Sequence, residues 1–304
     1  MRLLTRSDFD GLICGTILTH LGMIEEWKFV HPKDMQDGLI EVTSNDVVCN
    51  IPYAEGCGLW FDHHASEDKR LQGVAKVEGV SKIAPSCARN VYEYYGGKEK
   101  MPQFEEMMMA VDKVDSADLT VDEIKNPSGW ILLGFITDPR TGLGRFRDYT
   151  ISNYHLMEVL MKACGEQTID EILALPDVKE RLDIYHEQNI LFEQMLKRCT
   201  RTVGNLIITD IRDEEVIYAG NRFLVYALFP EQNVSMWITW GREKKNIAVA
   251  VGYSIINKTC EVHIGHLMLE NGGGGHHQVG TCQIETGKFD GADGVCEKLI
   301  DKLK

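Results

Sequence analysis

Two aspartates near the start of the chain are separated by one residue, in the segment Ser7-Asp8-Phe9-Asp10-Gly11. They follow apolar residues 3–5, which predict a strand, and precede residues 11–21, which predict a helix. Ligands of open parallel sheets bind at the carboxyl ends of the strands, so this position suits carboxylates that bind a metal ion. The simpler alternative is a helix N-cap and a turn.

A second group of polar residues, Asp62-His63-His64, comes directly after the apolar run 59–61. This pattern is typical of a buried strand that ends at a polar tip. One carboxylate and two imidazoles suit a transition-metal ion such as Mn, Fe or Zn better than Ca. The alternative is a surface loop that carries two histidines by chance.

Three more aspartates, Asp112, Asp115 and Asp118, are spaced three residues apart. If the helix expected over residues 104–114 continues, this spacing brings their carboxylates near one helix face. Like charges on one face repel unless solvent separates them or a cation binds. A solvated acidic helix end explains any one of them equally well.

Four consecutive glycines, Gly272, Gly273, Gly274 and Gly275, are followed by His276 and His277. A packed domain tolerates such a run where the backbone approaches a ligand closely or where successive N–H groups bind an anion. A flexible linker is the alternative, but apolar residues flank the run. Basic residues Arg140, Arg145 and Arg147 offer further phosphate contacts, or else form a solvated loop.

The elements that position these residues alternate between strand and helix in the first half of the chain. The expected strands span residues 3–5, 27–30, 46–51 and 59–61, and the expected helices span residues 11–21, 85–95 and 104–114. This alternation predicts an α/β domain with a doubly wound parallel sheet.

A helix over about residues 177–201 follows Pro176 and is expected to bridge two domains. Beyond it, residues 206–211, 234–240 and 247–253 are rich in strand formers, the glycine run interrupts a helix-like stretch, and residues 291–304 predict a closing helix. We therefore expect a first domain over 1–180, a helical linker over 181–202, and a smaller α+β domain over 203–304, with a cleft between the domains.

The composition narrows the classes of function. The 304 residues are 44% hydrophobic and 26% charged, and their formal net charge is −14. An acidic protein repels the nucleic-acid backbone, so duplex DNA is not an expected partner, and neither is a membrane. The nine cysteines include no Cys-x-x-Cys pair, and the start of the chain has no secretory pattern. We expect reduced thiols and a cytoplasmic location.

These motifs, in this order, resemble the DHH phosphoesterase superfamily with its DHH-associated C-terminal domain. The resemblance spans nearly the whole chain. The segment GGGGHHQVGTCQ, from Gly272 to Gln283, is similar to that of members called exopolyphosphatase-related. It implies that Asp8 and Asp10 each contact one of two Mn²⁺ ions and that His63 binds the second. It also implies that Asp62 orients the neighbouring ligand and that His64 faces the substrate phosphate.

Further roles follow from the same resemblance. Either Asp112 or Asp115 completes the shell of the second ion. The residues that hold the far end of the substrate are Gly273, Gly274, Gly275 and His276. Apart from the resemblance, Arg140 and Arg145 are our expected phosphate contacts, with a solvated basic loop as the alternative. The ions are one or two Mn²⁺, with Mg²⁺ or another divalent metal as the alternative.

Two departures from the family pattern weaken the first metal site. The family carries a His or Asp shortly before Asp-x-Asp, where this chain has Leu4 and Arg6. The family carries a bridging Asp where this chain has Asn50, the remaining position of our expected metal set. We expect one tight and one weak metal site.

The expected function is metal-dependent hydrolysis of a small phosphorylated substrate: a short single-stranded oligonucleotide, a nucleotide bisphosphate or polyphosphate. The alternative is a catalytically weakened relative that binds a nucleotide and regulates. A homodimer is a further expectation.

Overall fold

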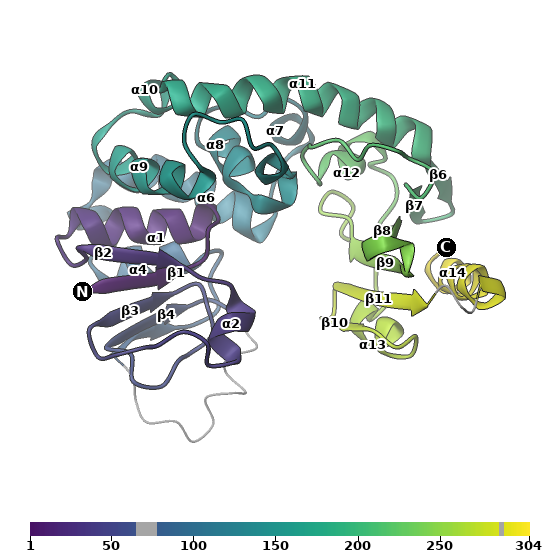
Figure 1. Cartoon of the computed structure of the whole chain (residues 1–304), viewed down its shortest axis with the longest axis horizontal. Coiled ribbons are helices and arrows are strands. Elements are labelled where there is room, and N and C mark those ends of the chain that lie inside the picture. Colours follow the sequence, from purple (N-terminus) through teal and green to yellow (C-terminus); the bar gives the residue numbers. More distant parts are fainter. Residues whose placement is uncertain (65–77, 286–288) are drawn as a thin grey trace. The chain divides into compact units, whose positions relative to one another are not determined.

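The computed structural model describes residues 1–64, 78–285 and 289–304. For residues 289–293 it describes the backbone alone. The chain divides into two compact units (Figure 1). The first contains residues 1–118 and 127–185, and the second contains residues 119–126 and 186–304. The division falls within a long helix, α11 (Pro176–Cys199), which begins with the expected proline. Among the helices of the described residues, none is long and apolar enough to cross a membrane.

The first unit contains a parallel sheet of five strands within the described residues. The order is β2-β1-β3-β4-β5, and the strands are β1 (Arg2–Thr5), β2 (Glu26–Phe29), β3 (Asp46–Cys49), β4 (Leu59–Asp62) and β5 (Glu78–Ser81). The four expected strands are present. β5 was not expected, because its Glu-Gly-Val-Ser sequence contains a single apolar residue.

Helices cover both faces of this sheet. Leu3 and Leu4 of β1 are fully buried and point to opposite faces, as the alternation of a strand requires. Leu3 approaches Gly15 of α1 (Phe9–His20), whereas Leu4 packs with Met35 of α2 (Pro32–Gln36). Figure 1 shows α1 and α2 on the two sides of the strands. The expected doubly wound α/β class is confirmed.

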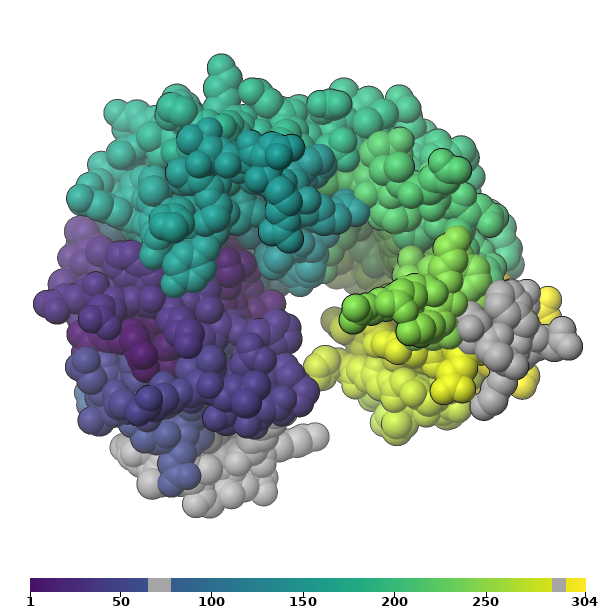
Figure 2. Space-filling model, in the orientation of Figure 1, coloured from purple at the N-terminus to yellow at the C-terminus, as the bar shows by residue number. Residues whose placement is uncertain are grey.

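The remaining helices of the first unit pack around α1. They are α4 (Cys87–Tyr94), α5 (Gly97–Lys100), η1 (Pro102–Phe104), α6 (Glu105–Ser116), α8 (Gly129–Thr137), η2 (Pro139–Thr141), η3 (Leu143–Arg145), α9 (Asn153–Glu166) and α10 (Ile169–Leu173). Gly134 of α8 lets that helix approach Phe9, because a Cβ there would overlap the phenyl ring. In Figure 2 this unit forms one continuous packed surface from purple to teal.

The strand order brings the polar residues that follow β1, β3 and β4 to one edge of the sheet. The chain passes from β1 to β2 at one side and returns to β3 at the other, so the direction of winding reverses between β1 and β3. Open α/β sheets bind ligands in the crevice outside the carboxyl ends of the strands at such a point. Asp8 follows β1, Asn50 follows β3, and His63 follows β4.

The second unit contains a mixed sheet of six strands among the residues described, in the order β10-β11-β9-β8-β7-β6. Its elements are α7 (Val121–Lys125), β6 (Thr200–Val203), β7 (Leu206–Asp210), α12 (Leu224–Leu228), β8 (Val234–Trp240), η4 (Arg242–Lys244), β9 (Asn246–Tyr253), α13 (Ile264–Leu269), β10 (Gly274–Gly275), β11 (Val279–Glu285) and α14 (Phe289–Leu303). The strands expected in this region and the closing helix are present.

We expected the glycine run to interrupt a helix-like stretch. Instead, the run follows the end of α13, and its last two residues form a short hairpin with β11. Gly274 pairs with Thr281, and Gly275 pairs with Gly280. A Cβ at Gly273 would overlap the carbonyl of Thr281, and one at Gly275 would overlap the carbonyl of Val279. These two glycines are therefore required by close packing between β10 and β11.

Candidate metal centre and active site

Asp10 lies in the first turn of α1, and its carboxylate is held by the start of another helix. Oδ2 accepts a hydrogen bond from the backbone N–H of Cys87 (3.0 Å), and Oδ1 accepts one from Ala88 (2.7 Å). These are the first two residues of α4, whose unpaired N–H groups and helix dipole favour a negative charge. The Asp10 carboxylate is therefore fixed in position before any ligand binds.

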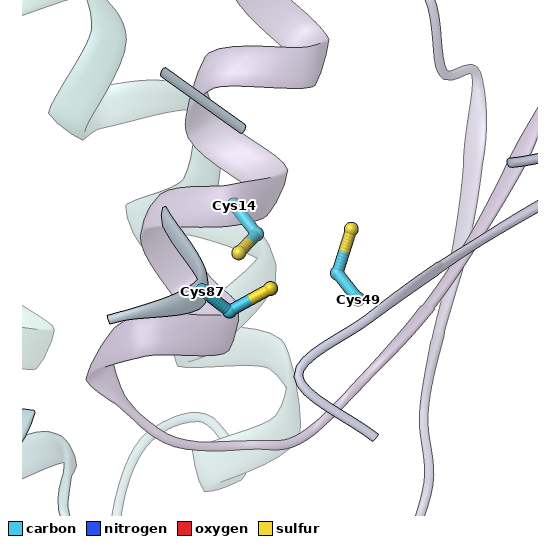
Figure 3. Close-up of side chains that lie close together, drawn as sticks. All are labelled: Cys14, Cys49 and Cys87. Carbon is cyan, nitrogen blue, oxygen red and sulfur yellow. The ribbon is translucent and has the colours of Figure 1, made fainter. Parts of the chain in front are cut away.

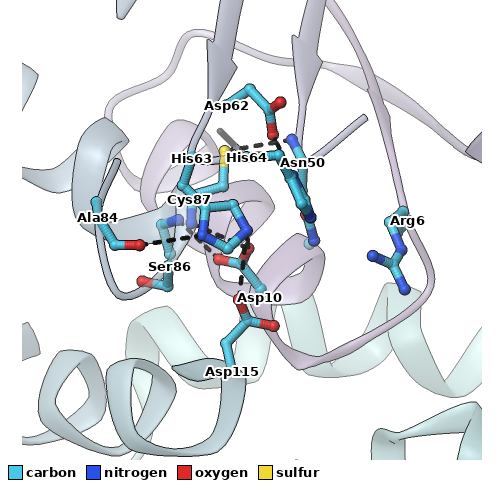
Figure 4. A network of polar contacts seen from close by, with 12 residues as sticks. Arg6, Asp10, Asn50, Asp62, His63, His64, Ala84, Ser86, Cys87 and Asp115 are labelled. Carbon is cyan, nitrogen blue, oxygen red and sulfur yellow. Dashed lines mark hydrogen bonds and ion pairs between the residues drawn. The ribbon is translucent and has the colours of Figure 1, made fainter. Parts of the chain in front are cut away.

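His63 presents one ring nitrogen to this carboxylate (Figure 4). Its Nδ1 lies 3.2 Å from the carbonyl oxygen of Ala84 and donates to it, since a carbonyl can only accept. In neutral His63 the other nitrogen, Nε2, then carries a lone pair. Nε2 lies 3.3 Å from Oδ2 of Asp115 and 3.8 Å from Oδ2 of Asp10. A backbone partner at Nδ1 is the usual arrangement for a metal-binding histidine.

The donor atoms of Asp10, His63 and Asp115 all lie within 4.8 Å of one another. Burial, followed by the charge of Asp115, raises the pKa of Asp10 well above its usual value. Burial likewise raises the pKa of Asp115 to about 6, although His63 opposes the shift. Two carboxylates and an imidazole lone pair that face one another are stable together only with a positive charge between them. These three residues therefore fit a divalent cation with oxygen and nitrogen ligands.

Asp8 has a different environment, because three groups of the chain already contact it. Its Oδ1 accepts from the backbone N–H of Gly11 (3.0 Å), which caps α1, and from Nδ2 of Asn50 (3.1 Å). Its Oδ2 lies 3.0 Å from Nε of Arg6. The guanidinium of Arg6 supplies positive charge where the family pattern has a metal-binding side chain. The negative charge of Asp8 is therefore balanced by the guanidinium of Arg6.

Asn50 follows the end of β3, and its side chain contacts Asp8. Its φ angle is +57°, in the left-handed region that asparagine tolerates better than most residues. The side-chain Oδ1 is buried and has no hydrogen-bond partner among the described residues. A buried oxygen without a partner is costly, so this atom is suited to a ligand that supplies positive charge or a hydrogen.

Asp62 and His64 form a pair beside His63. Nδ1 of His64 lies 2.8 Å from Oδ1 of Asp62, which is buried at the end of β4. The hydrogen bond that His64 donates to Asp62 raises the pKa of His64, although burial opposes this. The resemblance implied that Asp62 orients the neighbouring metal ligand, His63. The hydrogen bond of Asp62 is instead with His64. The donor atoms of Asp62, His63 and His64 also lie within 4.8 Å of one another.

Asp112 lies in a separate network. Its carboxylate accepts from the hydroxyl of Ser86 (2.7 Å) and forms an ion pair with Arg89 (2.6 Å). Ser86 is the N-cap of α4 and Arg89 lies in its first turn, so Asp112 ties α6 to α4. The structure brings Asp115 to Asp10 and His63 and gives Asp112 a structural contact.

Arg140 is held beside the aspartates by a residue that sequence reasoning missed. Its Nε lies 2.8 Å from Oδ1 of Asp138, which is buried. Asp8, Asp10, Asp115, Asp138 and Arg140 line a common pocket. The spacing Asp138-Pro139-Arg140 could have indicated this pair, because the two side chains are close enough in sequence to form a local ion pair. Arg145, by contrast, donates to the carbonyl of Gly142 within its own turn (3.1 Å).

The glycine run and His276 lie in the second unit. The backbone N–H of His276 donates to the carbonyl of Val279 (2.7 Å), which closes the β10–β11 hairpin. A Cβ added at Gly274 would meet nothing within 4 Å. The same holds for Gly272, but its φ of +77° disfavours a side chain, so Gly274 is the glycine of the run that can accept a methyl group without strain.

Comparison with known proteins identifies the family. A pGpG-specific phosphodiesterase from Vibrio cholerae, PggH, is 45% identical to this chain, with a TM-score of 0.89, over 100% of this chain and 99% of the other. RecJ of Thermus thermophilus, in complex with Mn²⁺, has the same fold at 12% identity, with a TM-score of 0.50, over 100% of this chain and 52% of RecJ. No family model and no curated protein matches the chain.

The chain belongs to the DHH phosphoesterase superfamily. It is a metal-dependent phosphoesterase that acts on a small phosphorylated substrate, and the pGpG phosphodiesterase PggH is similar to it over the full length.

Proposed function

We propose that this enzyme hydrolyses the phosphodiester bond of pGpG, a linear dinucleotide, and releases two molecules of GMP. The observation that carries this proposal is the 45% identity to a pGpG-specific phosphodiesterase along the entire chain. Identity at this level without gaps in coverage supports a shared substrate as well as a shared fold. The net charge of −14 supports a short substrate over a long duplex.

We propose that Asp10, His63 and Asp115 hold the tightly bound ion and that this ion is Mn²⁺. Support comes from the mutual distances of their donor atoms and from the carbonyl of Ala84, which leaves Nε2 of His63 free to bind. The mixed oxygen and nitrogen donors suit Mn²⁺. An ion there would supply Lewis acidity toward the phosphoryl oxygens. Asp112 is the less suitable candidate because Arg89 already neutralises it.

A second ion would bind more weakly near Asp8. Arg6 and Asn50 both engage the Asp8 carboxylate, so a cation must compete with the guanidinium for Oδ2. The unpartnered Oδ1 of Asn50 offers a neutral oxygen ligand, not a charged one. The expectation of one tight and one weak site therefore stays our proposal, with Arg6 as an additional physical cause.

The residues around this centre have distinct proposed roles toward the scissile phosphate. His64, whose proton is retained by its bond to Asp62, would donate a hydrogen bond to a phosphoryl oxygen. Arg140, held by Asp138, would contribute a charge-assisted contact to the same group. Both groups lower the cost of the negative charge that develops on the phosphoryl oxygens.

Other assignments are also proposals. The glycine run and His276 are proposed to bind a part of the substrate away from the reacting phosphate, as the family resemblance implies, and Arg145 is proposed as a further phosphate contact. We propose a cytoplasmic location, since all nine cysteines, which lie in described parts of the chain, are free thiols. A homodimer remains a prediction.

A substrate comparison tests the function. The full chain is stripped of metal, supplied with Mn²⁺, and assayed with pGpG, pApA, cyclic di-GMP and a five-nucleotide RNA. We expect pGpG to give GMP with the highest kcat/KM. Equal turnover of pApA would contradict guanine specificity, and faster hydrolysis of the cyclic dinucleotide would contradict the linear substrate.

A further inference from the structure

Three cysteine thiols meet in the core of the first unit (Figure 3). Cys14 comes from α1, Cys49 is the last residue of β3, and Cys87 is the first residue of α4. All three have no solvent exposure, and their sulfur atoms lie within 4.8 Å of one another. The Cys14 and Cys49 thiols both hydrogen-bond to Cys87.

A single buried cysteine usually behaves as a small apolar side chain. Cys164 on α9 and Cys282 on β11 are such cases, since no other thiol joins them in a candidate metal site among the described residues. The three sulfurs differ because they converge from three separate elements on one point. Segments that are far apart in the sequence bring them together.

The spacing of the sulfurs suits a bound ion. A metal–sulfur distance of about 2.3 Å places the three sulfurs of a trigonal or tetrahedral site about 3.8–4.0 Å apart. The observed upper limit of 4.8 Å therefore requires shifts of no more than about 1 Å to reach that geometry. Rotation about the Cα–Cβ bond of each cysteine can supply such a shift.

Backbone groups orient the sulfur of Cys87 within the cluster. Its Sγ accepts a hydrogen bond from the backbone N–H of Asn50 (3.2 Å). The same sulfur donates a hydrogen bond to the carbonyl oxygen of Phe61 (3.1 Å), and it gives up this proton when a cation binds. These two features come from the backbone and do not depend on neighbouring carboxylates.

We propose that Cys14, Cys49 and Cys87 form a binding site for one thiophilic cation, such as Cu⁺, Zn²⁺ or Cd²⁺, separate from the centre of Asp10, His63 and Asp115. The two sites divide cations by softness, because thiolates select soft ions whereas carboxylate and imidazole ligands suit Mn²⁺. Each thiol that binds the cation releases its proton to solvent.

Occupancy of the thiol site would lower the rate of hydrolysis. The backbone N–H of Cys87 holds the Asp10 carboxylate, and Sγ of the same residue accepts from Asn50 (Figure 4). A sulfur that rotates toward a cation pulls directly on the contact with Asn50, whose side chain also holds Asp8. The thiol site is thus coupled to the metal centre through Asn50.

Cadmium binding to the full chain, saturated with Mn²⁺, tests the proposal. We expect one Cd²⁺ per chain with the ultraviolet thiolate-to-cadmium charge-transfer band, together with a loss of hydrolysis. Cys14→Ser and Cys49→Ser should each weaken this binding by more than about tenfold, since one sulfur is lost. Cys164→Ser, a buried cysteine outside the cluster, is the matched control and should retain the band. A band of unchanged affinity in Cys14→Ser and Cys49→Ser, or no band in the unmodified chain, would overturn the proposal.

A second measurement needs no variant and covers the case in which the serine variants do not fold. The chemical shift of bound ¹¹³Cd distinguishes sulfur ligands from oxygen and nitrogen ligands. We expect one resonance in the range of sulfur-rich sites. Resonances confined to the range of oxygen and nitrogen ligands would show that Cd²⁺ binds the catalytic centre or the surface instead, which would refute the thiol site.

Discussion

Nε2 of His63 lies 3.3 Å from Oδ2 of Asp115, and the other ring nitrogen of His63 donates to the carbonyl of Ala84. The backbone thereby selects the tautomer whose lone pair faces a carboxylate. Such a contact between an acceptor and an anion is favourable only when a cation or a proton lies between them. This relationship locates the tight ion at Asp115 in our proposal and leads to the first prediction.

Asp115→Asn should weaken Mn²⁺ binding by more than about a hundredfold, because it removes a charged ligand of the proposed tight site. Calorimetric titration of the metal-free protein measures this. Asp112→Asn is the matched control: it lies one helical turn away, loses the ion pair with Arg89, and should lower the melting temperature while leaving Mn²⁺ affinity within about threefold. The opposite pattern between the two variants would assign the ligand to Asp112.

Asn50→Asp should tighten the weak metal site and raise activity at low Mn²⁺ concentration. The new carboxylate would lie against Asp8, since Nδ2 of Asn50 now lies 3.1 Å from Oδ1 of Asp8. The two charges repel without metal, so the metal-free variant should melt at a lower temperature and gain more from added Mn²⁺.

Asn50→Gly is the control for this change, because glycine accepts the positive φ angle of the position and supplies no side-chain ligand. It should not tighten the weak site. If Asn50→Asp gains no more stability from Mn²⁺ than Asn50→Gly does, the residue at this position does not contact the second ion.

Gly274→Ala and Gly273→Ala should separate substrate binding from folding. A methyl group at Gly274 meets open space, so this variant should keep its stability and raise KM for pGpG if the run contacts the substrate. Gly273→Ala should destabilise the second unit, because the methyl group overlaps the carbonyl of Thr281. Melting curves and steady-state kinetics measure the two effects. An unchanged KM in Gly274→Ala would remove that glycine from the substrate-binding set.

Arg2 and Asp46 join β1 to β3 and give a pH-dependent contribution to stability. Burial alone would raise the pKa of Asp46, but hydrogen bonds from Arg2 and Thr43 outweigh it and lower that pKa. A lowered pKa in the folded state means that the contribution is full above about pH 4 and is lost as pH falls through the folded-state pKa.

Asp46→Asn should therefore reduce the free energy of unfolding by about 2 kcal/mol at pH 7, the range for a hydrogen bond to a charged group. The difference from the unmodified chain should shrink below about pH 4. Urea unfolding at pH 7, 5 and 3.5 measures it. A difference that stays constant over this range would show that the ion pair is not the source.

Much of the first unit could be predicted because its polar tips follow short apolar runs. Asp8 and Asp10 come after residues 3–5, and His63 comes after residues 59–61, so strand prediction also placed the candidate ligands at one edge of a parallel sheet. β5 was missed because its own residues do not alternate, and its place in the sheet comes from pairing with β4.

The details that sequence could not provide depend on contacts between distant elements. Asp112 and Asp115 lie on the same helix, and only the partners on α4 and β4 distinguish them. The contact between Arg6 and Asp8 depends on how the loop after β1 turns. Gly274 and Gly275 form a strand because β11 pairs with them, and the propensity of four glycines carries no such information.

The most direct test of the central claim is the rate of GMP release from pGpG by the metal-free protein as Mn²⁺ is added. We predict no turnover without metal, turnover that rises and saturates with Mn²⁺, and no turnover at any Mn²⁺ concentration in folded His63→Ala, which loses the ligand held by Ala84. Turnover by the metal-free protein, or undiminished turnover by His63→Ala, would contradict a phosphodiesterase whose ion is bound by Asp10, His63 and Asp115.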